Sequence, residues 1–192
     1  MHDLIGKLTP EQALEVVVRL SDQGGPIGDA VLAEAQNVLS AIDLDEIAGE
    51  VFFVLDSIDV QECWNMAGAS RDGYTSPDEA AYELIDEQLQ SFFEQAGRYH
   101  ELGMTREEGT YCRGVILGIY RYEHESKSEF RQWCVDVPIE CARALLTRWR
   151  ERGPDPASGT AMDDFIRHRC PSWTKYLLRT GACGAERAGE GR

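Results

Sequence analysis

The stretch from Ser76 to Glu125 constrains the fold most, because it reads as two long helices joined by one glycine. Ser76-Pro77-Asp78-Glu79 predicts a capping box, in which a hydroxyl accepts a backbone N–H and a Glu three residues later returns the bond. Gly103 ends this helix, and Thr105-Arg106-Glu107-Glu108 predicts a second capping box that opens the next one. The helical hairpin indicates an all-α fold.

Helix-start signals recur along the whole chain. Thr9-Pro10-Glu11-Gln12 is another capping box, and Asp43 and Asp59 precede further helical patterns. Later helices are predicted over 128–134, 138–152, 161–169 with Thr160 as the cap, and 172–179 with Ser172 as the cap. We therefore expect about ten helices in antiparallel hairpins, arranged as a degenerate helical-repeat (solenoid-like) array or as an irregular bundle.

Apolar residues at helical spacing predict which faces are buried. On the first two helices, residues 10–23 and 27–41, the side chains expected to face inward are Leu14, Val17, Val18, Leu20, Val31, Leu32, Ala35, Val38 and Leu39. On the second hairpin helix, Gly114 and Gly118 lie four residues apart. Each interior glycine costs a helix about 1 kcal/mol, so the pair predicts that a neighbouring helix approaches closely there.

The length of 192 residues suits one domain. We expect a single all-α domain over residues 1–180, with a possible subdivision into 1–68 and 76–180 at the Gly- and Ser-containing loop 68–76. The Gly/Ala/Glu/Arg segment 181–192 is predicted to be a disordered tail.

The net charge of −15 disfavours non-specific binding to nucleic acid or anionic lipid. Residues 1–142 hold 9 Lys and Arg against 28 Asp and Glu, whereas residues 143–192 hold 10 against 6. The basic end is predicted either to be solvated or to dock on an acidic surface. No apolar run approaches the ~20 residues of a membrane span, and no signal segment is evident, so we expect a cytoplasmic protein without membrane contact.

The six cysteines form no Cys-x-x-Cys pair, and most fall on apolar helix faces. Reduced, buried thiols are the expectation. A zinc site remains open only if residues distant in the chain converge, the candidates being Cys134, Cys141, His168 and Cys170. No cofactor is predicted.

The sequence completes no catalytic motif. His100-Glu101 and His124-Glu125 each begin the zinc-protease pattern His-Glu-x-x-His, but Met104 and Ser128 stand where the second His belongs. A Ser or Cys nucleophile with a His base stays open, because such partners are remote in sequence.

Two groups of residues are candidate sites. Trp, Tyr and Arg dominate binding hot spots, so Arg148, Trp149 and Arg152 form the candidate partner-binding cluster. A pocket between hairpins is predicted near His100, Tyr111 and Tyr120.

Part of the chain resembles a known family. The phrases Leu8-Thr9-Pro10-Glu11-Gln12-Ala13-Leu14, Val16-Val17-Val18-Arg19-Leu20-Ser21 and Val31-Leu32-Ala33-Glu34-Ala35 are similar to the helical region that follows the zinc finger in bacterial SWIM-type proteins. The phrase from Gly103-Met104 to Gly118-Ile119-Tyr120 resembles the repeats downstream of it. The zinc finger itself is missing, so the resemblance implies a bacterial helical scaffold and carries over no metal or nucleic-acid role.

These observations favour a non-enzymatic helical scaffold or protein–protein interaction module with an unknown protein partner, which includes a second copy of the chain. One alternative is a small-molecule binder or enzyme with a pocket between helical hairpins. The other is an adaptor that contacts nucleic acid through its basic C-terminal third.

Overall fold

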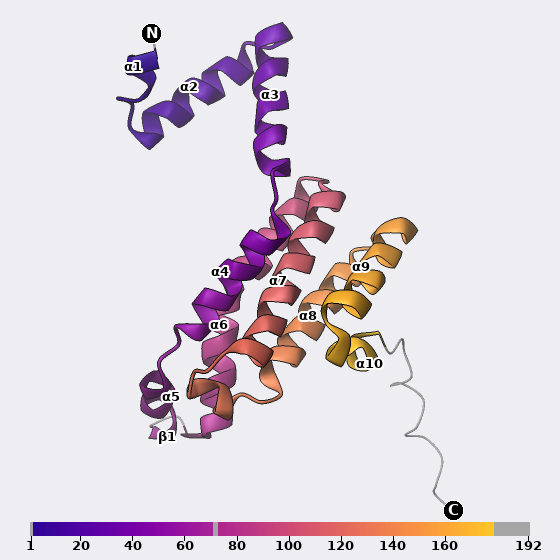
Figure 1. Ribbon diagram of the computed structural model, residues 1–192. Coiled ribbons are helices and arrows are strands. Elements are labelled where there is room, and N and C mark those ends of the chain that lie inside the picture. Colours follow the sequence, from indigo (N-terminus) through magenta and orange to yellow (C-terminus); the bar gives the residue numbers. More distant parts are fainter. Residues whose placement is uncertain (1, 71–72, 179–192) are drawn as a thin grey trace, which may run out of the picture. The chain divides into compact units, whose positions relative to one another are not determined.

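The computed structural model describes residues 2–70 and 73–178, and it divides the chain into two compact units, Met1–Ile42 and Asp43–Arg192 (Figure 1). The sequence predicted a single domain with a possible subdivision at the loop 68–76; the structure divides after Ile42, and that loop lies inside the second unit. The predicted tail 181–192, with Cys183, lies outside the described residues.

The first unit consists of α1 (His2–Ile5), α2 (Pro10–Asp22) and α3 (Gly25–Ser40). The Thr9 capping box forms as predicted, with Gln12 as the returning residue. Gly24 and Gly25 turn the chain with φ of 63° and 59°, which L side chains rarely adopt. From this turn α2 and α3 diverge (Figure 1), and Gly28 is the one buried residue within the two helices.

The second unit is an irregular helical bundle, which confirms the all-α class. Its elements are α4 (Leu44–Asp56), α5 (Val60–Met66), β1 (Gly68–Ser70), β2 (Gly73–Thr75), α6 (Pro77–Glu101), α7 (Thr105–Glu125), η1 (Phe130–Trp133), α8 (Val137–Glu151), α9 (Pro156–Arg169), η2 (Pro171–Trp173) and α10 (Thr174–Leu177). The segment predicted as a loop holds a small antiparallel hairpin, in which Gly68 pairs with Thr75 and Ser70 with Gly73.

Helix α7 lies at the centre of this unit, packed against α4, α6, α8 and α9 (Figure 1). A Cβ atom added at Gly118 would lie 2.5 Å from the Val51 Cβ, and one added at Gly114 would lie 2.8 Å from the Ile47 Cβ. The close helix approach predicted from the two glycines is therefore confirmed, and α4 is the partner.

Three predicted helix starts are wrong. In each, another hydrogen-bond partner or another capping residue takes the place of the predicted one. Thr105 is the first residue of α7 rather than its cap, and Glu108 binds Arg152 and His100 instead of reaching back. Helix α9 begins earlier than Thr160, because the Asp155 carboxylate accepts from the N–H groups of Ala157 and Ser158 and Pro156 starts the helix.

The third is Ser172, which caps no α-helix. It lies in the 3₁₀ turn η2, and its hydroxyl is hydrogen-bonded to His124 instead.

The five described cysteines are buried and unpaired, as the sequence predicted. Burial raises the pKa of the Cys112, Cys141 and Cys170 thiols to about 12 and that of Cys134 to about 11. These thiols stay protonated and act as small apolar side chains.

Candidate functional site

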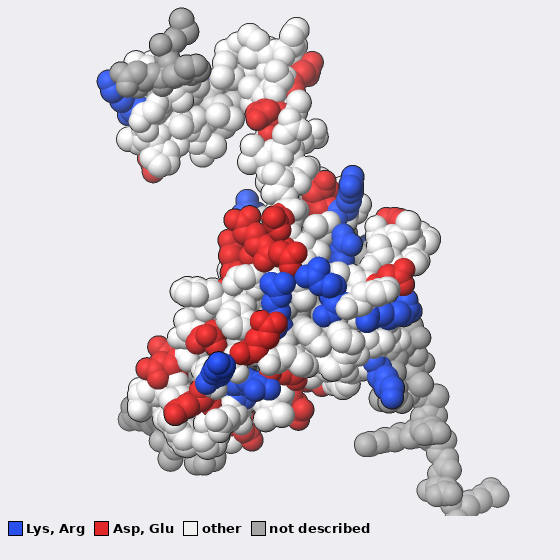
Figure 2. Space-filling view, viewed as in Figure 1, with Lys and Arg blue, Asp and Glu red and all other residues white. Residues whose placement is uncertain are grey.

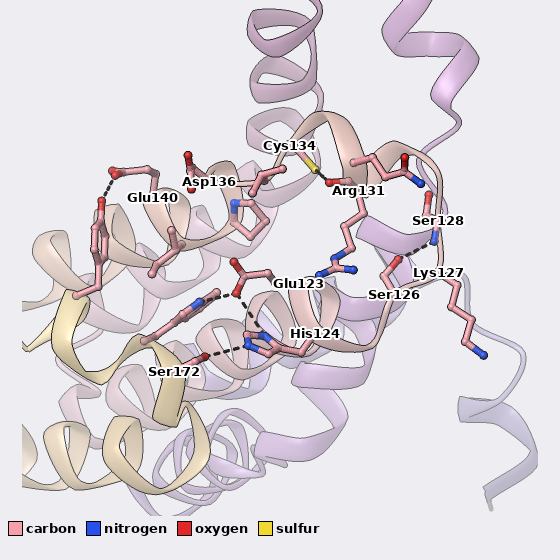
Figure 3. A pocket seen from close by; sticks show the side chains of 16 residues that line it. Glu123, His124, Ser126, Lys127, Ser128, Arg131, Cys134, Asp136, Glu140 and Ser172 are labelled. Atoms are coloured by element: carbon pink, nitrogen blue, oxygen red, sulfur yellow. Dashed lines mark hydrogen bonds and ion pairs between the residues drawn. The ribbon is translucent and has the colours of Figure 1, made fainter.

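A cavity of about 1000 Å³ opens beside the end of α7 (Figure 3). It lies where α7, η1, the start of α8 and the segment η2–α10 meet, so segments far apart in sequence line it. The lining residues that carry chemistry are Glu123, His124, Lys127, Arg131, Asp136, Glu140, Ser172 and Tyr176.

Hydrogen bonds fix the turn that forms one wall of this cavity. Helix α7 ends at Glu125, and the Ser126 hydroxyl donates to Asp56 Oδ1 at 2.6 Å and accepts from the Ser128 N–H at 3.1 Å. The Ser128 hydroxyl in turn accepts from the Phe130 N–H at 3.2 Å, which starts η1. The last turn of α7 is therefore held in place on the cavity side.

A serine and a histidine meet at the cavity mouth. Ser172 Oγ lies 2.9 Å from His124 Nε2. The other ring nitrogen, Nδ1, lies 2.9 Å from the carbonyl oxygen of Tyr120. Because a carbonyl oxygen only accepts hydrogen bonds, Nδ1 carries the hydrogen, and in the neutral ring Nε2 is an acceptor beside the Ser172 hydroxyl, which donates to the Tyr120 hydroxyl at 3.2 Å.

Neighbouring side chains hold the imidazole of His124 in this orientation. The ring stacks on Tyr120 at 4.1 Å between centroids, and Tyr120 contacts Trp173 edge-on at 5.0 Å. Glu123 Oε2 lies 3.3 Å from His124 Nδ1 and accepts the indole N–H of Trp173, which is 2 % exposed. A buried tryptophan thus positions the carboxylate beside the ring.

The rest of the lining combines cations, acids and an apolar wall. Arg131 and Lys127 supply positive charge, and Val135, Pro138 and Ile139 supply the apolar wall. At the far rim in Figure 3, the Tyr176 hydroxyl donates to the Glu140 carboxylate, which raises the pKa of Tyr176.

The predicted pocket residues fall at two places, with His100 and Tyr111 where α6 ends and α7 begins and Tyr120 near the other end of α7. His100 Nδ1 lies 3.3 Å from Glu108 Oε2, and Tyr111 packs on Tyr99 with centroids 5.5 Å apart. Tyr120 borders the Ser172–His124 pair, where its hydroxyl lies 3.2 Å from Ser172 Oγ. Of the three, Tyr120 alone lies beside the large cavity.

The predicted partner-binding cluster does not form an exposed surface. Trp149 is 2 % exposed and packs against Gly109 in the core. Arg152 binds the buried Glu108 carboxylate, and the Arg148 guanidinium lies 5.5 Å from the centre of the Phe93 ring. Spacing alone did not reveal that the aromatic member of the cluster points inward.

Arginines of the basic C-terminal third pair with acids of the same chain. Arg169 shares Asp45 with Arg121 of α7, at 2.8 Å each, and Arg150 binds Asp163 at 3.0 Å. These ion pairs join α9 to α4 and to α8, so the acidic surface that the basic end meets includes α4 of its own unit (Figure 2).

The cysteine and histidine residues considered for zinc do not form a site within the part of the chain that the structure describes. Cys134, Cys141 and Cys170 are buried, whereas His168 is exposed and its Nδ1 lies 2.7 Å from the Asp164 carbonyl oxygen. No group of three or more His, Cys, Asp or Glu among the described residues is placed to hold a metal ion.

A second candidate surface is the apolar face of the first unit. Among the described residues, sixteen large apolar side chains are exposed, and nine of them lie before Asp43. They are Leu4, Ile5, Leu14, Val16, Val17, Val18, Ile27, Leu32 and Val38. Several of these were predicted to face inward, and in the single chain they face solvent.

Sequence reasoning missed the Ser172–His124 pair. The two residues are 48 positions apart, and Ser172 follows a proline in a pattern that resembles a helix cap. No local signal joins them. Only the packing of η2 against the end of α7 does so.

Comparison of this chain with known proteins found no relative. Among the described residues, no helix combines the length and apolar character that crossing a membrane requires. The resemblance to SWIM-type proteins stays a prediction. No model of a known protein family, no curated protein and no solved structure matches this chain.

Proposed function

We propose that this protein is a helical interaction module that assembles through α2 and α3, and that a second copy of the chain is the partner. One observation carries the proposal: the first unit exposes nine large apolar side chains, while Gly28 is the one buried residue of α2 and α3. A helical pair with so little burial needs a further surface to stabilise it, because most helical stability in proteins comes from packing an apolar face.

The apolar residues of α3 occupy one side of the helix. At about 3.6 residues per turn, Ile27, Val31, Leu32, Val38 and Leu39 fall within one arc, with Ala35 at its middle. Asp29, Asn37 and Ala33 fall on the opposite side. This division is the pattern of a helix that packs one face against a partner.

Helix α2 has the same division. Leu14, Val17 and Val18 lie on one side, 64 %, 47 % and 47 % exposed, and the opposite side carries the Glu15–Arg19 ion pair together with Val16. Fully burying a Val, Leu or Ile side chain contributes about 1.5–3 kcal/mol. Covering the six exposed residues of the two faces, Leu14, Val17, Val18, Ile27, Leu32 and Val38, therefore contributes on the order of 5–10 kcal/mol per copy. Over both copies, that gain is comparable to or larger than the cost of about 4–15 kcal/mol for bringing two chains together.

Charge favours a second copy as the occupant. The chain carries −15 overall, so two copies repel each other wherever their acidic surfaces meet. Residues 1–42 hold two Lys or Arg and six Asp or Glu, and α3 has only Asp29 and Glu34 among its 16 residues. Figure 2 shows this region largely without charge, in contrast to the acidic patches on the second unit. The self-repulsion is least where the apolar area is greatest.

A matched pair of substitutions on α3 tests the proposal. Ala35→Lys places a charge in the middle of the apolar arc, and Ala33→Lys places the same charge on the polar side; both alanines are exposed. Sedimentation equilibrium of the full chain is expected to give twice the 21.5 kDa chain mass for the wild type and for Ala33→Lys. Ala35→Lys is expected to weaken association at least about tenfold, which is 1.4 kcal/mol.

Two outcomes would overturn the proposal. One is a wild-type chain that sediments at the single-chain mass up to about 100 μM, which is about 100 times the Kd of a micromolar dimer. The other is equal weakening by both substitutions, because that result would trace association to charge alone and not to the apolar face.

A further inference from the structure

We propose that Ser172 is the nucleophile of an acyl-transfer site, with His124 as its general base, which hydrolyses small carboxylic esters in the cavity of Figure 3. This inference is independent of assembly through α2 and α3, and it departs from the non-enzymatic character expected from the sequence.

The hydrogen-bond chain has the direction that nucleophilic catalysis needs. In the neutral ring Nε2 of His124 is the unprotonated nitrogen, since Nδ1 donates to the Tyr120 carbonyl oxygen, so Nε2 is placed to take the Ser172 proton once the hydroxyl turns from the Tyr120 hydroxyl toward it. Glu123 lies 3.3 Å from Nδ1 and stabilises the imidazolium that forms when the proton arrives. Nucleophile, base and orienting groups are the three parts that such a site requires.

The base is held before a substrate arrives. Tyr120 stacks on the His124 ring, and Trp173 holds Glu123 through its indole N–H. Because these contacts fix the imidazole plane, the Ser172–His124 bond of 2.9 Å forms in the free protein. Ser172 itself is exposed at the cavity mouth, so an ester carbonyl has access to Oγ.

The lining defines the substrate class. Val135, Pro138 and Ile139 offer an apolar wall for the acyl chain, and Arg131 adds positive charge to the same cavity. A cavity of about 1000 Å³ has the size of a small-molecule site and accommodates a small ester.

The reaction balances without a cofactor. Ser172 Oγ forms a bond to the carbonyl carbon as its proton passes to His124 Nε2. The tetrahedral species collapses, the bond to the leaving oxygen breaks, and His124 returns the proton to the departing alcohol. Water then repeats the sequence on the acyl-serine, giving the carboxylic acid and the free Ser172 hydroxyl.

Covalent labelling tests the site directly. The full chain is treated with an alkyl fluorophosphonate, which phosphonylates activated serines, and the modified residue is mapped by peptide mass spectrometry. We expect the label on Ser172 and not on Ser91, an exposed serine of α6. Hydrolysis of p-nitrophenyl acetate is measured on the same samples.

Variants separate catalysis from loss of structure. His124→Gln is expected to slow both labelling and hydrolysis by about 10²–10⁴-fold, because the general base is lost. Ser172→Ala is expected to abolish the label and to reduce hydrolysis to the background rate measured without protein. Ser91→Ala changes an exposed serine of α6 outside the cavity lining, so its labelling of Ser172 should stay within a fewfold of the wild type. Circular dichroism confirms that each variant is folded.

Three results would overturn the proposal. The first is the absence of label on Ser172 under conditions that label a known serine hydrolase completely. The second is labelling of folded His124→Gln at the wild-type rate. The third is hydrolysis of p-nitrophenyl acetate by Ser172→Ala at the wild-type rate.

Discussion

Arg152 donates from Nη1 to Glu108 Oε1 at 2.7 Å, which joins the end of α8 to the first turn of α7. The Glu108 side chain is 3 % exposed, so its charge is compensated by Arg152 rather than by water, and its Oε2 lies 3.3 Å from His100 Nδ1. This buried pair explains why the predicted capping box at Thr105 does not form.

Removal of the Glu108 charge should destabilise the fold strongly. Glu108→Gln removes the counter-charge of Arg152, whose side chain is 27 % exposed, and puts a buried amide in place of the carboxylate, so the expected cost is about 1–3 kcal/mol. Asp164→Asn is the matched control, because the Asp164–Arg167 pair is 56 % and 50 % exposed and such pairs contribute below about 1 kcal/mol. Urea denaturation followed by circular dichroism measures both. Equal losses in the two variants would mean that burial of Glu108 does not decide its contribution.

The close contact between α4 and α7 predicts that adding a single methyl group at Gly118 lowers the stability of the fold. Gly118→Ala places a Cβ 2.5 Å from the Val51 Cβ and 2.7 Å from the Ala48 carbonyl oxygen, so the two helices must move apart. Overpacking of this kind costs about 1–3 kcal/mol.

The control for this variant is another helical glycine. Gly49→Ala on α4 meets no atom within 4 Å and should stabilise the fold by up to about 1 kcal/mol, because alanine favours a helix. Thermal unfolding of the two variants compares the signs. Stabilisation by both substitutions would show that α4 and α7 are not in close contact.

The buried thiols predict that stability falls in alkaline solution. The pKa of Cys112, Cys141 and Cys170 rises from 9.0 to about 12 because burial disfavours the thiolate. Stability is thus complete below the unfolded pKa near 9 and is lost as pH rises from there toward 12, since only the unfolded chain ionises in that window. Each thiol contributes a slope of about 1.4 kcal/mol per pH unit.

Urea midpoints between pH 7 and pH 10.5 check this slope. Cys112→Ala should make the decline shallower by the contribution of one thiol, whatever its effect at pH 7. A midpoint that stays constant above pH 9 would contradict the burial of these groups. Buried Tyr111 and Tyr122 add a decline of the same sign at higher pH, because burial raises the pKa of both phenols.

Local sequence signals predicted well where helices form, but predicted less well which of two candidate residues caps a helix. The Ser76 capping box and the helix over Pro77–Glu101 could be predicted because both ends of each hydrogen bond lie within four residues. Two residues were candidates for the N-cap of α9, Asp155 and Thr160. Asp155 is the cap, because Pro156 takes the first helical position. Periodicity therefore located this helix but not its start.

The site depended on distances that no local pattern encodes. Ser172 and His124 meet because η2 packs against the last turn of α7, and the sequence between them contains two helices. The apolar stripes of α2 and α3 were recognised, but periodicity predicts that a face is to be covered without naming what covers it. That limit explains why Leu14, Leu32 and Val38 were expected inward and are exposed in the single chain.

The most direct test of assembly through the first unit is amide hydrogen exchange at two protein concentrations. If a second copy covers α2 and α3, dilution from about 100 μM to about 0.1 μM should remove protection from these helices and leave α7 protected, because local opening follows the loss of burial. Full protection of α2 and α3 at the lower concentration, with no change on dilution, would contradict the account, since it would place the covering surface within the same chain.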